Sequence, residues 1–123
     1  MSRYFRTFLD LSYWFTNTHI YRYTGTSMKA TQTFWHKARI QNRYILEMSI
    51  HQLEKSERYP DGIKYGLILV DTKTDRRLLM DNHHPKGPHI HLGDEELSYE
   101  FIDENKLIED FKTYAFNYMG VKL

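Results

Sequence analysis

Cysteine is absent from this 123-residue chain, which excludes disulfide bonds and every zinc site built on thiolates. No apolar run approaches the roughly 20 residues that a membrane-spanning helix needs. The N-terminal stretch is too interrupted by Arg, Thr and Asp to serve as the apolar core of a signal peptide. These absences fit a protein of the reducing cytoplasm, and we expect a cytoplasmic location without membrane association.

A strong net charge is also lacking, because the formal charge at pH 7 is only +1. The charge is nevertheless uneven. Residues 1–60 hold nine Lys or Arg against four Asp or Glu, whereas residues 61–123 hold eight against twelve. A basic half favours an anionic partner such as nucleic acid. Solvated surface charge of both signs explains the same pattern equally well.

The chain length fits one domain. Residues 1–27 differ from the rest in being rich in aromatic side chains, and they end in a breaker-like Thr-Gly-Thr-Ser run. Helical spacing of several apolar residues allows a short helix at about residues 3–15. We therefore expect an aromatic N-terminal extension over residues 1–27, either helical or poorly ordered, followed by a single α+β domain over residues 28–123.

Residues from 28 onward alternate between polar and apolar side chains, which is typical of strands. Short turns separate these segments, so we predict an antiparallel meander of four to five strands. The expected strands cover residues 28–38, 44–52, 63–70, 76–80 and 97–101. An apolar stripe at helical spacing between Asp103, a suitable N-cap, and Gly120 predicts a C-terminal helix packed on one face of the sheet.

Histidines are concentrated in the segment 82–96, which we predict to be a loop because Pro85, Gly87, Pro88 and Gly93 disturb a regular ladder. Four of the seven histidines lie within nine positions of this segment. These four are His83, His84, His89 and His91. Loops often carry function, so a functional role is the favoured interpretation. The alternative is a turn whose polar side chains hydrogen-bond to their own backbone.

Three kinds of chemistry fit this histidine segment. One imidazole could take a proton from an RNA 2′-hydroxyl while a second, protonated imidazole supplies one to the leaving oxygen, without any metal. Asp81 could orient one histidine, and Lys86, Arg76 or Arg77 could stabilise the charge on phosphorus. His89 and His91 would project to one side if the backbone is extended, and with His83 or His84 and Asp81 they would make a nitrogen and oxygen set suited to zinc, nickel or iron. A non-catalytic contact with nucleic acid or protein is the third possibility.

Several short motifs agree in order and spacing with a known family. They are Lys64-Tyr65 before an apolar strand, Met80-Asp81-Asn82-His83, Lys86-Gly87-Pro88-His89-Ile90-His91, Asp94-Glu95-Glu96, Tyr99-Glu100-Phe101 and a closing Leu107-Ile108-Glu109-Asp110-Phe111 helix. From about Met28 to the C-terminus, the chain resembles the TumE family of toxins from two-gene toxin–antitoxin modules. The resemblance implies an antitoxin partner, often one with a helix-turn-helix.

The residues and the resemblance together lead to one hypothesis, a toxin that acts as an endoribonuclease. His89 and His91 would transfer protons, Lys86 would stabilise charge and Asp81 would orient, with no cofactor and no metal. The alternatives are a non-catalytic binding module for nucleic acid or protein and a histidine-based metal site. Six further positions are expected to contribute to binding: Asn82, His83, His84, Gly87, Arg76 and Arg77. The acidic run at residues 94–96 is expected mainly to be a solvated tip.

Overall fold

The structure, a computed structural model, describes residues 20–23 and 26–123. In chain order its elements are β1 (Ile20–Tyr23), β2 (Thr26–Ile40), β3 (Tyr44–Leu53), β4 (Ile63–Asp71), β5 (Arg77–Asp81), β6 (His89–Leu92), β7 (Glu95–Ser98) and α2 (Glu104–Met119). The helix expected at residues 3–15 lies outside the described residues. Positions 27 and 28, where we placed the domain boundary, lie within β2, and the boundary itself remains a prediction.

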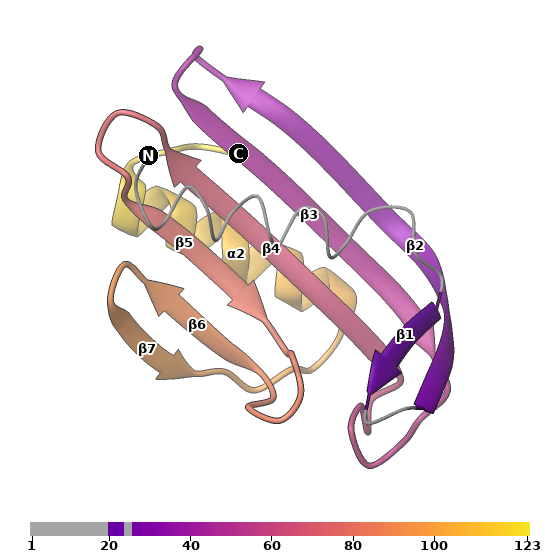
Figure 1. Cartoon of the computed structure of the whole chain (residues 1–123). Coiled ribbons are helices and arrows are strands. Elements are labelled where there is room, and N and C mark those ends of the chain that lie inside the picture. The colour runs from indigo at the N-terminus through magenta and orange to yellow at the C-terminus, as the bar shows by residue number, and fades with distance from the viewer. Residues whose placement is uncertain (1–19, 24–25) are drawn as a thin grey trace.

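Six consecutive strands, β2 to β7, form an antiparallel sheet in which each strand pairs with its neighbour in sequence. Strand β1 pairs with the beginning of β2 and adds a seventh strand at that edge. The predicted α+β meander is thus confirmed, whereas the predicted number of four to five strands is too low. Figure 1 shows the strands side by side with α2 behind them.

The strand count was too low because the segment 82–96 is not one loop. Strands β6 and β7 lie largely within it, and the strand expected at 97–101 coincides with β7 only at its first two residues. Pro88 directly precedes β6, so it removes no donor from the ladder. Gly93 has a φ of 64° in the turn between the two strands, a conformation that glycine adopts readily. The residues that indicated a loop therefore lie in the connection between β5 and β6 and in the turn between β6 and β7.

The C-terminal helix forms where the sequence predicts it. Asp103 is the N-cap, and its Oδ1 accepts a hydrogen bond from the backbone N–H of Lys106 at 2.7 Å. Gly120 ends the helix with a φ of 71°, and its N–H reaches the carbonyl groups of the last turn. The buried side chains of Leu107, Phe111 and Ala115 pack on the sheet. No helix among the described residues has the length and apolar character needed to cross a bilayer.

The two faces of the sheet differ in chemistry. The face toward α2 is apolar and forms the main core, with Leu46, Met48, Ile50, Tyr65, Leu67, Leu69, Leu78, Met80 and Ile90. The opposite face combines a small apolar cluster, formed by Ile68, Val70 and Leu79, with buried polar side chains. Because neighbouring residues in a strand point to opposite faces, this difference follows from the alternation in the sequence.

Candidate active site

Strands β5, β6 and β7 bring four polar side chains to the face opposite α2. The register pairs Asp81 with His89 and His91 with Glu96. Directly paired residues in an antiparallel ladder point to the same face, and so do residues two apart in one strand. The two histidines, the aspartate and the glutamate therefore form one cluster, which we call the histidine cluster. The sequence expectation that an extended backbone would project His89 and His91 to one side is confirmed.

His89 is held by an oxygen atom at each ring nitrogen. Its Nδ1 lies 2.7 Å from the carbonyl oxygen of Gly87, and its Nε2 lies 3.0 Å from Oδ1 of Asp81. His89 and Asp81 are each only 7% exposed. Gly87 has a φ of 74°, which a residue with a side chain rarely adopts, and this conformation turns its carbonyl toward the ring. The ring is thus fixed in position before any ligand binds.

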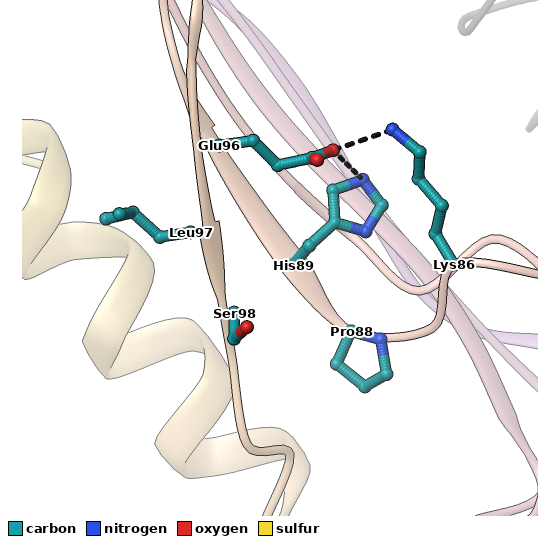
Figure 2. A pocket seen from close by; sticks show the side chains of 6 residues that line it. All are labelled: Lys86, Pro88, His89, Glu96, Leu97 and Ser98. Atoms are coloured by element: carbon teal, nitrogen blue, oxygen red, sulfur yellow. Dashed lines mark hydrogen bonds and ion pairs between the residues drawn. The ribbon is translucent and has the colours of Figure 1, made fainter.

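Three nitrogen atoms surround one carboxylate oxygen. Oε1 of Glu96 lies 2.8 Å from Nζ of Lys86, 3.5 Å from Nε2 of His91 and 3.8 Å from Nε2 of His89. Figure 2 shows Lys86, His89 and Glu96 pointing toward one another, while Leu97 points away toward α2. A cleft of about 220 Å³ opens beside them, lined by Lys86, Pro88, His89, Glu96, Leu97 and Ser98.

The electrostatics of the cluster follow from its burial. Burial raises the pKa of Asp81, and the nearby positive charges of His89 and Lys64 oppose that rise. Burial also lowers the pKa of His91, and the charge of His89 lowers it further. The two imidazole rings meet edge to face, with centroids 4.6 Å apart and planes at 85°. The neutral form of His91 is therefore favoured.

Two members of the site were not selected from the sequence. Glu96 was assigned to a solvated acidic tip, but β7 turns it into the cluster while Glu95 faces the other side. Lys64 is fully buried at the start of β4, and burial lowers its pKa to about 6. When Lys64 is protonated, its charge lowers the pKa of Asp81. A lysine inside an otherwise apolar strand was the signal that could have identified it.

Comparison with known protein families tests the resemblance carried by the short motifs. A family model described as Toxin TumE matches residues 10–118. The chain belongs to the TumE toxin family. It is accordingly a toxin component of a toxin–antitoxin system, with a cognate antitoxin as partner. The match begins before Met28 and so extends beyond the stretch that carried the resemblance. No curated protein and no solved structure matches the chain.

Three of the positions that we expected to bind in this TumE-family toxin have other contacts. Asn82 bridges the backbone of β4, because its Oδ1 accepts from the N–H of Tyr65 at 2.9 Å and its Nδ2 donates to the carbonyl of Ile63 at 2.8 Å. His83 is half-buried, and burial lowers its pKa to about 4, so it is neutral at pH 7. The backbone N–H of His84 donates to the hydroxyl of Tyr59 at 3.3 Å.

The two expected arginines point in different directions. Arg76 directly precedes β5, and its side chain reaches the C-terminal end of α2, where its Nη1 donates to the carbonyl of Tyr118 at 3.2 Å. Arg77 shares the face of the histidine cluster, since it pairs with Val70, and its charge contributes to lowering the pKa of His91. Of the six predicted binding positions in this TumE-family toxin, Gly87 contacts His89 and Arg77 lies on the same face of the sheet as the cluster.

The donor atoms of the cluster are also close enough to share a ligand. Asp81, His89 and His91 each offer one such atom, and these atoms all lie within 4.8 Å of one another. Imidazole nitrogen and carboxylate oxygen together suit ions such as zinc. Chemically, this part of the toxin can therefore transfer protons, hold an anion beside Lys86 or bind a metal ion.

Proposed function

We propose that this toxin acts on RNA and cleaves it at the histidine cluster by acid–base chemistry. The observation that carries the proposal is the convergence of three nitrogen atoms, from Lys86, His91 and His89, on one oxygen of Glu96. We take that carboxylate oxygen as marking the position of a phosphate oxygen of RNA. Its side chain is 42% exposed, so it can move aside when a phosphate enters.

The cleavage would proceed by transfer of the phosphoryl group to the neighbouring ribose. Neutral His91 takes the proton from the 2′-hydroxyl, and the oxygen attacks the adjacent phosphorus. The bond between phosphorus and the 5′-oxygen breaks, and the imidazolium of His89 gives a proton to that oxygen. The products are a 2′,3′-cyclic phosphate and a 5′-hydroxyl end. Neither water nor a metal ion takes part in this step.

The environment of each histidine supports its role. Both ring nitrogens of His89 face an acceptor oxygen, which is the arrangement that an imidazolium satisfies. Asp81 would hold that imidazolium in position, and burial favours the neutral form of His91. Lys86 would stabilise the negative charge that develops on the phosphoryl oxygens. These assignments follow the geometry of the cluster and place the proton donor and acceptor on one strand.

The first test is growth inhibition during expression without antitoxin. His89→Ala and His91→Ala should each relieve inhibition at equal expression level, because each removes a proton-transfer group. His36→Ala, in an exposed position of β2, is the matched control and should remain inhibitory. If both cluster variants inhibited growth as strongly as the parent, the assignment of these histidines would be wrong.

The second test uses purified protein, total RNA and mass analysis of the ends. We expect cyclic-phosphate ends that form in the presence of EDTA. The alternative is a non-catalytic binding module for nucleic acid or protein, and the charge distribution supports the nucleic-acid case. Such a module would leave the RNA intact. It would shift the RNA in a mobility-shift assay if it binds nucleic acid, but not if it binds only protein. The family also supports a cytoplasmic toxin whose antitoxin carries a helix-turn-helix, and copurification of the two proteins would identify that partner.

A further inference from the structure

The close contact between Nε2 of His89 and Oδ1 of Asp81 is favourable only if a positive charge lies between the two atoms. If the imidazole is neutral, its single proton sits on Nδ1, because that nitrogen is 2.7 Å from the carbonyl oxygen of Gly87. The lone pair of Nε2 then faces Oδ1 of Asp81 at 3.0 Å, an arrangement of two acceptors. Apart from His89, no residue in the described part of the chain offers a hydrogen-bond donor to Oδ1, although Asp81 is only 7% exposed. A buried pair of this kind needs a positive charge between its atoms.

A proton is one such charge, and a metal ion is the other. Ligand atoms of a tetrahedral zinc site lie about 2.0–2.1 Å from the ion and therefore about 3.4 Å from one another. Three distances between ligand atoms in the cluster lie on either side of that value. Oδ1 of Asp81 is 3.0 Å from Nε2 of His89, and Oε1 of Glu96 is 3.5 Å from Nε2 of His91 and 3.8 Å from Nε2 of His89. The donor atoms of Asp81, His89 and His91 all lie within 4.8 Å of one another.

We propose that Asp81, His89 and His91 bind one zinc-like divalent metal ion, with Oε1 of Glu96 as the fourth ligand, and that the bound ion blocks RNA cleavage. The metal site stands on the geometry of the cluster alone. The block rests on the proposed function, because the ion would occupy the same Nε2 atoms that the proton transfers need.

The choice of ion follows from the chemistry of the ligand atoms and from the hydrogen bond that holds His89 in position. Two imidazole nitrogens with carboxylate oxygens favour zinc and its neighbours over magnesium or calcium, which prefer oxygen. The hydrogen bond from Nδ1 of His89 to the carbonyl of Gly87 is the outer contact that metal-binding histidines usually make, and it leaves Nε2 free to coordinate. Glu96 would exchange its contact with Lys86 for the ion.

Calorimetric titration of the chelator-treated full chain with Zn²⁺ and, separately, Mg²⁺ tests the site. We expect one Zn²⁺ per chain and no measurable Mg²⁺ binding. His91 is the less buried of the two histidines, so its replacement disturbs the fold less. His91→Gln should weaken Zn²⁺ binding by at least about tenfold. His36→Gln, in an exposed position, is the control that should bind as the parent does.

Two further readouts keep the site testable if a cluster variant is poorly folded. Co²⁺ added to the parent should give visible absorption bands typical of a tetrahedral site. Zn²⁺ should also raise the unfolding temperature of the parent more than that of His91→Gln. Absence of the absorption bands together with Zn²⁺ binding that is equal in parent and His91→Gln would overturn the metal site.

RNA cleavage measured with the same samples separates the two proposals. Cleavage that persists in EDTA and stops with one equivalent of Zn²⁺ supports both the metal block and the acid–base chemistry. Cleavage that needs Zn²⁺ would overturn the block and the metal-free mechanism while leaving the metal site in place. Absence of cleavage by folded protein in either condition would overturn the proposed function, and the binding data would still decide the site.

Discussion

Replacing Asn82 with alanine should destabilise the fold, because its side chain connects β5 to the backbone of β4. The residue is 7% exposed, and its amide makes two hydrogen bonds, of 2.9 Å with the N–H of Tyr65 and 2.8 Å with the carbonyl of Ile63. A hydrogen bond contributes about 1 kcal/mol net, and a buried group left without a partner costs about 1–3 kcal/mol. The free energy of unfolding should therefore fall by about 2–4 kcal/mol.

Urea unfolding followed by circular dichroism measures this change. With a denaturant dependence of about 2 kcal/mol per molar urea, the midpoint should move down by about 1–2 M. Asn117→Ala, on the exposed side of α2, makes the same chemical change without the two backbone bonds and should leave the midpoint nearly unchanged. A loss of less than about 0.5 kcal/mol for Asn82→Ala, within the range of ordinary surface changes, would refute the reasoning.

Three further predictions follow from single contacts. Glu96→Gln should strengthen binding of a fluorescent RNA oligomer, measured by anisotropy, because it removes the carboxylate charge from the proposed phosphate position; Glu95→Gln, on the other face of β7, changes charge equally and should have the smaller effect. Arg43 donates two hydrogen bonds to Asp71, at 2.9 and 2.7 Å, and holds the pKa of that carboxyl below its ordinary 3.8. This depressed pKa stabilises the fold fully above about pH 4, and the contribution is lost progressively as the pH falls toward the pKa of Asp71 in the folded state. The difference in the free energy of unfolding between parent and Asp71→Asn should therefore shrink from pH 7 to pH 3. A difference in urea unfolding that stays constant over this range would contradict this. Asp103→Ala should lower the free energy of unfolding by about 1 kcal/mol through loss of the N-cap, and Asp103→Ser should restore most of it.

The strands that carry regular alternation and the capped helix could be predicted from the sequence. The helix between Asp103 and Gly120 was found because its start and stop signals are local. Strand β6 was missed and β7 was expected two residues too late, because each has only four residues and lies among turn residues. The alternation of His89, Ile90 and His91 was the available signal for β6, and its polar members concealed it.

The candidate site could be predicted in its histidines but not in its surroundings. His89, His91, Asp81 and Lys86 were selected because their chemistry is visible in the sequence, and the structure brings them close together. Glu96 was not found, since three consecutive acidic residues look alike until a strand separates their faces. The structural use of Asn82 could not be foreseen either, because it depends on which backbone groups of a neighbouring strand lack a partner.

The cluster is built from residues 81–96, a single short stretch at one edge of the sheet. Its assembly needs only the closure of two small loops, so it adds little to the entropic cost of folding. The same arrangement makes it separable from the main core, because all four residues of β7 are exposed and β6 is its only partner strand within the described chain. Opening of this hairpin would carry Glu96 away from His89 and His91 while the rest of the sheet stays folded. Access to the cluster is therefore governed by the local stability of one hairpin, and amide exchange in β7 should report it directly.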